Sequence, residues 1–439
     1  MMVKHFKDLS DEQVAKFNAR CAQLGVDPSK IQTSVTTAGA ENGLHCGHPA
    51  ANSTFPPANI LKVANVAQLK ALCACKDEDY VRGLESDAQV RYPQPLSELA
   101  LPPLSSHGRD VALIENFMTE TQKAAVVQAL HAFLVGNSNK VKDYEAIINA
   151  IHFPMSLAVY AAQDITITAA NPLVLDSDQI GLYNFGVVTV EPGGSIQVVT
   201  AAQMDSQVFN GQTALGGAGG TVPTINFRGA NGSDGTDGTA GTDGSNGGNA
   251  VQGSPSGNNC DCNNPSPVAA TASGNGTAGS AGTRGADGSI SGTSVFSLGA
   301  ISGPIQVTYI GGVGGKGGAG KAGGKGGNGG NAAGAAAAPC NNSYAGTPSG
   351  NGANGGNGGN GGNGANGPNV TIYYTSITSD TTFSIDTSSI AAGAGGASGA
   401  GGAAGSGGTG GGTAGNPGTA GVPGITGSPG TLSARLQPA

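Results

Sequence analysis

The stretch that decides the fold runs from residue 311 to residue 334 and reads GGVGGKGGAGKAGGKGGNGGNAAG. Glycine occupies every third position from Gly311 to Gly329, and a second glycine usually follows it. A period of three fits neither the 3.6-residue repeat of an α-helix nor the two-residue repeat of a strand. It fits the polyproline-II conformation, which repeats every three residues. The stretch therefore predicts an extended glycine-rich rod.

Several other runs in the second half of the chain keep the same period, and β-prone segments separate them. Such runs begin at Gly229, Gly276, Gly352, Gly393 and Gly415. The order of run, strand pair and run is typical of a repeat architecture with an irregular period. Similar run lengths favour parallel rods that strand segments connect.

Packing explains why the residue at every third position must be glycine. A polyproline-II chain makes no internal hydrogen bonds, so its N–H and C=O groups must pair with neighbouring chains. Close approach requires edges without Cβ atoms, which only glycine provides. Asn357, Asn360 and Asn363 are then expected on one outward edge, with Lys316 and Lys325 on the equivalent edge of the first quoted run. A disordered glycine-rich linker is the alternative, and collagen is a second one for the proline-containing last run.

The first half of the chain predicts different structure. Ser10 with Gln13 and Thr119 with Gln122 have the spacing of helix capping boxes. Short β-prone runs with turns between them follow Pro154, typical of a sandwich or, as the alternative, a β-solenoid. The predicted fold class is multi-domain. It comprises a small α-helical N-terminal module (1–155), a short all-β module (156–210) and a C-terminal polyglycine-II helix bundle with β-strand connectors (211–439).

Composition excludes several classes of protein. The 439 residues include 78 Gly, 11% are charged and the net charge is −8. No basic block exists, so nucleic acid is not an expected partner. No run of 18 or more apolar residues exists, which predicts no membrane insertion. The N-terminus lacks a hydrophobic signal core, so the chain either stays inside a cell or virion or leaves by a route that needs no cleaved signal. We expect an extracellular, cell-surface or virion protein without a recognisable cleaved signal peptide.

Two groups of cysteines are candidate sites. The first combines His45, Cys46 and His48 with Cys73 and Cys75, residue types that bind zinc, although the spacing differs from the usual structural-zinc patterns. Disulfides or buried thiols are the alternative, and no other cofactor is expected. The second group is Cys260, Cys262 and Cys340, which lie in similar Asn- and Pro-rich breaks. If both breaks lie at one end of a bundle, a disulfide from Cys340 to either partner would join them.

No catalytic constellation is found, so we predict that the protein is not an enzyme. The Gly-x-Gly-x-x-Gly matches follow from the glycine period and no βαβ unit precedes them. Tyr344, Tyr373 and Tyr374 in the connectors are the candidate binding residues, with burial in a core as the alternative.

The GGNGGNGGNGANG run, residues 355–367, resembles the glycine-rich bundles of the receptor-binding tip adhesins of T-even-type phages. It also resembles the glycine-rich domains of the mycobacterial PE_PGRS proteins and, more loosely, the glycine-rich springtail antifreeze proteins. The resemblance covers roughly residues 211–430 and concerns fold type. It implies a non-enzymatic protein that recognises a cell-surface glycan or protein. The alternatives are a self-assembling filament or coat subunit, whose partners are copies of itself, and an ice-binding protein. We expect a homo-oligomer.

Overall fold

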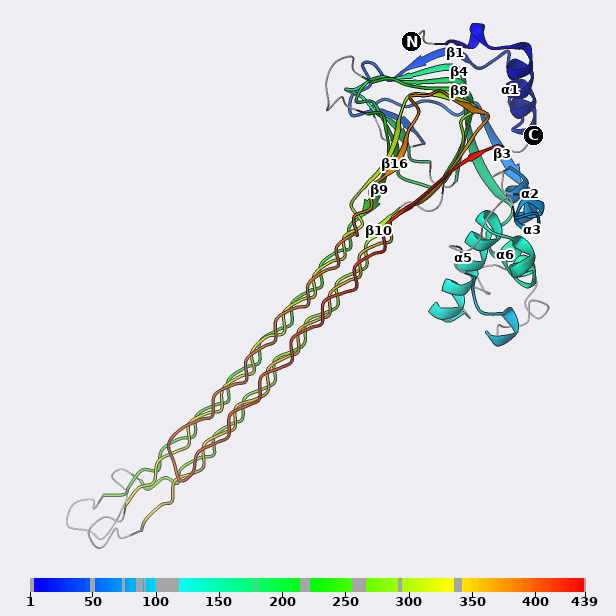
Figure 1. Ribbon diagram of the computed structural model, residues 1–439. Helices are drawn as coiled ribbons and strands as arrows, with labels where there is room; N and C mark the ends of the chain where they lie inside the picture. The colour runs from blue at the N-terminus through cyan, green and yellow to red at the C-terminus, as the bar shows by residue number, and fades with distance from the viewer. Residues whose placement is uncertain are drawn as a thin grey trace.

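Two sheets of parallel strands organise the molecule, and the chain alternates between them (Figure 1). The structure is a computed structural model. It describes residues 4–47, 52–72, 76–83, 90, 92–99, 118–177, 180–213, 222–254, 266–290, 294–334 and 342–437. Within this part of the chain the fold is α/β, with sheets of ten and seven strands and few helices.

The ten-stranded sheet carries the longer strands. It consists of β1 (Gln32–Thr36), β3 (Asn59–Val63), β4 (Met155–Ile167), β6 (Gly181–Val190), β8 (Ala202–Gly211), β11 (Ser294–Ser297), β12 (Ala300–Ser302), β14 (Asn369–Tyr374), β15 (Ser376–Ile377) and β17 (Thr431–Leu436). The seven-stranded sheet consists of β2 (Leu44–Cys46), β5 (Leu173–Leu175), β7 (Ser195–Val198), β9 (Thr224–Ala230), β10 (Ser289–Ile290), β13 (Ile305–Ile310) and β16 (Phe383–Ile385). Strand pairs are parallel, except that β3 runs antiparallel to β4 and β10 to β9.

Alternation between the sheets places one apolar core between them. From β4 to β9 each strand belongs to the sheet opposite the preceding one. Inward-facing side chains from both sheets, such as Phe185, Phe209 and Phe227, are fully buried in a common cluster. Because side chains alternate faces along a strand, the residues between them point outward.

The helices cover the other side of the ten-stranded sheet or form a cluster beside it (Figure 1). They are η1 (Phe6–Asp8), α1 (Asp11–Gln23), α2 (Val66–Leu72), α3 (Asp77–Val81), η2 (Leu96–Glu98), α5 (Glu120–Val135), η4 (Ser138–Tyr144) and α6 (Glu145–His152). Both predicted capping boxes are confirmed, at the starts of α1 and α5. Arg20 of α1 forms an ion pair with Asp205 of β8 at 2.8 Å, which fixes α1 on the sheet.

A long glycine-rich shaft extends from the sheets (Figure 1). We define the shaft as six segments numbered first to sixth: 231–250, 268–288, 311–331, 347–367, 390–406 and 412–430. They form three hairpins, which leave the sheets after β9, β13 and β16 and return to β10, β14 and β17. Odd-numbered segments therefore run outward and even-numbered segments run back.

Backbone hydrogen bonds between the segments repeat every third residue. Gly235 N–H donates to the Lys316 carbonyl at 2.7 Å, and this series joins the parallel first and third segments. Gly318 N–H donates to the Thr283 carbonyl at 2.9 Å, in a series that joins the antiparallel third and second segments. Each series is dense because the inner edges carry glycine. A Cβ at Gly318 would lie 2.0 Å from the Thr236 carbonyl oxygen.

The register of the sheets continues into the shaft. Strand β9 pairs with β13 at a separation of 82 residues, and the Asn231 side chain accepts from Val313 N–H at the same separation. The β11–β14 separation of 76 residues recurs between Asn275 and Asn351. The β14–β17 separation of 62 residues recurs between the fourth and sixth segments. The sheets thus determine which glycine faces which carbonyl along the shaft.

The predicted fold class is wrong. The chain is not a polyglycine helix bundle with β connectors after separate helical and β modules, because its fold is an α/β arrangement of two large parallel sheets. Both sheets take strands from residues 1–155, 156–210 and 211–439. The predicted connectors are strands of these sheets, and their partners lie 29 to 92 residues away, where local sequence patterns give no signal. A glycine-rich helical filament conflicts with this fold and is dropped.

Candidate functional site

All three hairpins reverse direction at the distal end of the shaft, farthest from the sheets (Figure 1). An antiparallel bridge between Val251 and Val268 closes the first hairpin, with N–H···O distances of 2.9 and 3.0 Å. A bridge between Ala333 and Tyr344 closes the second, with both distances 3.0 Å. The third hairpin turns directly at Gly407 and Gly408, whose φ angles are +85° and +69°. The first two hairpins therefore carry longer turns.

The described residues of these longer turns expose apolar and amide groups. Val251 is 39% exposed and Val268 is 50% exposed. Asn342 and Ser343 are exposed beside the half-buried Tyr344. Exposed apolar side chains also occur elsewhere on the shaft, where Val422 is 64% and Ile425 is 74% exposed. Such groups gain free energy when a partner covers them.

The three candidate binding tyrosines do not come together. Tyr344 lies at the distal end, whereas Tyr373 and Tyr374 lie in β14, in the sheet region. Tyr373 is buried at 6% exposure beside Val295. The Tyr374 ring stacks on Phe383 with ring centroids 5.9 Å apart. Of the three, only Tyr344 is placed to contribute to a distal contact surface.

The candidate disulfide cysteines, Cys260, Cys262 and Cys340, lie outside the described residues. The chain on either side of each break ends at the distal end of the shaft, at the two bridges described above. The disulfide stays a prediction.

The candidate zinc residues do not converge in the described part of the chain. His45 and Cys46 are neighbours in β2, so their side chains point to opposite faces. Cys46 is fully buried, and burial raises the pKa of its thiol well above the ordinary value. His48, Cys73 and Cys75 lie outside the described residues. Among the residues that are described, no group of three His, Cys, Asp or Glu side chains could hold a metal ion.

The amide and carboxylate rows along the shaft have a structural role. Asp234 Oδ1 accepts from Lys316 N–H at 2.7 Å, and Asp243 Oδ1 accepts from Lys325 N–H at 2.7 Å. Asn357 Oδ1 accepts in the same way from Thr419 N–H at 2.9 Å. Each side chain satisfies an outward N–H of the neighbouring parallel segment, which would otherwise have only water as a partner. These rows are therefore not evidence of a ligand site.

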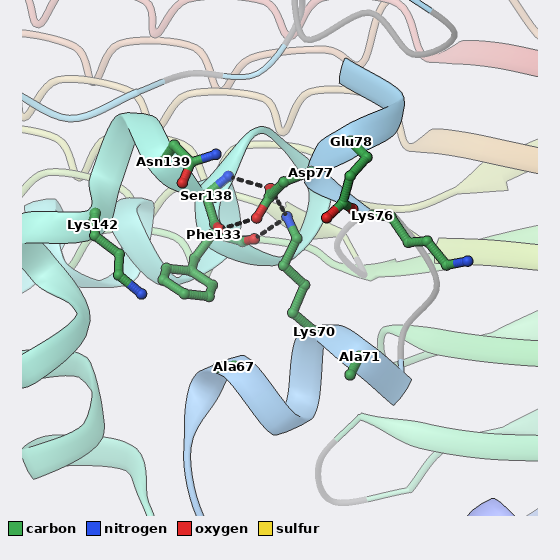
Figure 2. A pocket seen from close by; sticks show the side chains of 10 residues that line it. All are labelled: Ala67, Lys70, Ala71, Lys76, Asp77, Glu78, Phe133, Ser138, Asn139 and Lys142. Carbon is green, nitrogen blue, oxygen red and sulfur yellow. Dashed lines mark hydrogen bonds and ion pairs between the residues drawn. The ribbon is translucent and has the colours of Figure 1, made fainter. Parts of the chain in front are cut away.

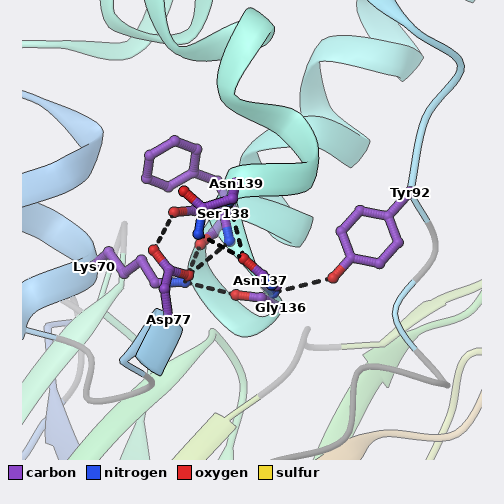
Figure 3. A network of polar contacts seen from close by, with 8 residues as sticks. Lys70, Asp77, Tyr92, Gly136, Asn137, Ser138 and Asn139 are labelled. Carbon is purple, nitrogen blue, oxygen red and sulfur yellow. Dashed lines mark hydrogen bonds and ion pairs between the residues drawn. The ribbon is translucent and has the colours of Figure 1, made fainter. Parts of the chain in front are cut away.

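An open pocket of about 340 Å³ lies between α2, α3 and the end of α5 (Figure 2). Its centre is the buried Lys70, whose Nζ donates to the Phe133 and Gly136 carbonyls at 2.8 and 2.6 Å and contacts Asp77 Oδ1 at 2.8 Å (Figure 3). Asp77 also accepts from Ser138 N–H at 2.7 Å. Because an ammonium has three donors, Lys70 has none left for a ligand. The network joins α2 and α3 to the carboxyl end of α5.

A cavity of about 570 Å³ opens on the outward face of the seven-stranded sheet, where β10 adjoins β9. Its lining includes Asp176, Gln197 and Arg228, which sequence reasoning did not single out. They lie on or directly after three different strands, β5, β7 and β9, and only the pairing of these strands brings them together. His45, which the sequence did indicate, faces this cavity.

Comparisons with protein-family models, curated proteins and solved structures found no match to this chain. None of the helices in the described residues is long and apolar enough to span a bilayer.

Proposed function

We propose that the protein is a non-enzymatic surface protein that recognises a cell-surface glycan or protein through the distal end of its shaft. The observation that carries this proposal is the continuous register from the sheets into the shaft. It supports a rigid projection whose far end presents two long turns. At about 3.1 Å per residue for an extended three-residue repeat, a segment of some 20 residues holds these turns roughly 60 Å from the sheets.

The contrast between the hairpins also supports the proposal. The third hairpin shows that a short turn, at Gly407 and Gly408, is enough to close a hairpin of this shaft. The first two instead carry long turns with exposed valines, and long loops on a rigid scaffold are where binding residues concentrate.

A turn exchange tests the proposal. Residues 251–268 and 333–344 are each replaced by the short SGGT turn of residues 406–409. Binding of native and exchanged protein is measured on an array of bacterial and animal surface glycans and on intact cells. We expect the native protein to bind a subset of these surfaces and the exchanged protein to lose that binding.

The control variant is Thr419→Ala, on an exposed outer row far from both turns. It should bind as the native protein does. Undiminished binding by the exchanged protein, with its shaft intact, would show that the distal end is not the contact surface.

A further inference from the structure

The cavity on the seven-stranded sheet has the chemistry of a built binding site, separate from the distal end of the shaft. It lies near the base of the shaft, beside β10. Its lining combines a guanidinium, a carboxylate, an imidazole and two amides with apolar side chains. The polar groups belong to Arg228, Asp176, His45, Asn42 and Gln197.

A close backbone approach adjoins the lining residue Asp176 in the sequence. Gly47 has a φ of +121°, and a Cβ there would lie 2.5 Å from Ser177 Cα, so only glycine fits. This approach follows the pairing of β2 with β5. It brings His45 Nδ1 to 2.6 Å from Asp176 Oδ2. The imidazole is therefore oriented before any ligand arrives.

Asp176 carries an unused acceptor. Its side chain is 7% exposed, and among the described residues its Oδ1 has no hydrogen-bond partner. A buried carboxylate oxygen without a donor is unfavourable. Because less than 1 Å² of this oxygen is exposed, Asp176 acts by holding His45, and a ligand hydroxyl group would meet the imidazole and the amides instead.

Arg228 supplies the charge. One of its nitrogens, Nη1, donates to Gln197 Oε1 at 2.9 Å, which fixes the guanidinium at the mouth of the cavity. No carboxylate of the described residues forms an ion pair with it, whereas Asp176 is paired with His45. A guanidinium binds a carboxylate through two parallel hydrogen bonds. The cavity therefore favours a ligand with one negative charge.

Val174, Val199 and Ile290 give the same cavity apolar surface. A ligand that fits must then combine a carboxylate, several hydroxyl groups and a face of C–H bonds. A sugar ring that bears a carboxylate has all three, and the volume is within the range of small-molecule sites.

We propose that this cavity binds an acidic sugar residue of a polysaccharide or glycan. Arg228 holds the sugar carboxylate, the amides of Asn42 and Gln197 hold its hydroxyl groups together with His45, which Asp176 orients, and the valines contact its C–H face. This site does not depend on the distal turns.

Titration calorimetry and saturation-transfer NMR with the full chain test the proposal. The probes are sodium glucuronate, N-acetylneuraminic acid, methyl glucoside and acetate. We expect at least one of the two acidic sugars to bind at least about tenfold more tightly than methyl glucoside and acetate, because only it uses both the guanidinium and the hydroxyl acceptors. Which of the two binds identifies the class of acidic sugar.

Arg228→Gln should weaken binding of the acidic sugar about tenfold or more and leave thermal unfolding unchanged, because the side chain is exposed. Thr308→Ala, on an outward-facing position of β13 outside the cavity, is the matched control and should bind normally. The turn-exchanged protein should also bind normally, which separates this site from the distal one. Equal binding of acidic and neutral sugars, no binding of either acidic sugar, or an unaffected Arg228→Gln variant would overturn the proposal.

Discussion

Lys70 shows how single side chains hold the helical cluster together. Its ammonium caps the carboxyl end of α5, where unsatisfied carbonyls gather, and Asp77 balances its charge. Burial raises the pKa of Asp77, but the hydrogen bonds from Lys70 and Ser138 outweigh that effect, so its pKa lies below the ordinary value. An ionised Asp77 therefore stabilises the folded state at neutral pH.

We predict that Asp77→Asn lowers the free energy of unfolding by about 1–3 kcal/mol at pH 7, since it leaves Lys70 without its counter-ion. A lowered folded-state pKa contributes stability that is present above the unfolded pKa, about 3.9, and is lost as the pH falls through the folded pKa. The gap between native protein and variant in urea unfolding should therefore close below about pH 4. Glu12→Gln, in an exposed pair on α1, is the control and should change little. A gap that does not depend on pH would contradict this role of Asp77.

Three prolines lie where the shaft needs no backbone N–H donor. Pro417, Pro423 and Pro429 are exposed in the sixth segment, which hydrogen-bonds to the fourth and fifth segments. Proline has no N–H to donate, so it suits an outer edge where an N–H would have no neighbouring chain. Their third-position spacing suggested collagen, but it also follows from a segment at the edge of this shaft.

At the scale of elements, the packing of each shaft segment depends on its triplet phase, that is, on which edge of the segment each residue of the three-residue repeat occupies. Glycine fills most positions on the edges that face neighbouring backbones, with Lys321 as an exception, and larger residues occupy the outward edge. Deleting Ala319 would move Lys325 to the position of Gly324, where a Cβ lies 1.8 Å from the Thr242 carbonyl oxygen. Deleting residues 320–322 would remove one full triplet, Lys321 included, and keep every later side chain on its own edge.

We predict that deletion of Ala319 exposes the shaft to proteolysis, whereas deletion of residues 320–322 leaves most of it resistant. Backbone cannot yield to a Cβ at that distance, so the distal part of the third segment would detach after the single deletion. Limited proteolysis followed by mass spectrometry of the fragments checks this. Equal sensitivity of the two deletions would mean that triplet phase does not control packing.

Local patterns predicted many of the elements but not their arrangement. The capping boxes, the glycine phase and strands such as β5, β7 and β13 follow from residues close together in the chain. The parallel sheets do not, because Phe185 and Phe209 become one core only through pairing of strands that carry no mark of their partner. The same limit applies to the cavity. His45 was noticeable as part of a His–Cys motif, but nothing local links it to Asp176 or Arg228.

For the whole molecule, the shaft has an interior and edges. The third and fourth segments each hydrogen-bond to four neighbours, whereas the first and sixth each hydrogen-bond to two. We predict that glycine amides of residues 311–331 and 347–367 exchange hydrogen more slowly than those of residues 231–250 and 412–430. Opening an interior segment requires breaking more series of bonds at once. Hydrogen-exchange mass spectrometry of the intact protein measures this, and fast, uniform exchange along all six segments would contradict lateral bonding.

The shared register of sheets and shaft also has a mechanical consequence. A pull on the distal turns, such as a moving cell surface would exert, acts along the segments. Sliding one segment past the next would break a whole series of bonds in shear, since every third residue is tied to the same neighbour at the same offset. The load then passes into β9, β13 and β16 without a hinge in the pairing. The shaft should therefore resist extension along its axis and transmit the force to the sheets.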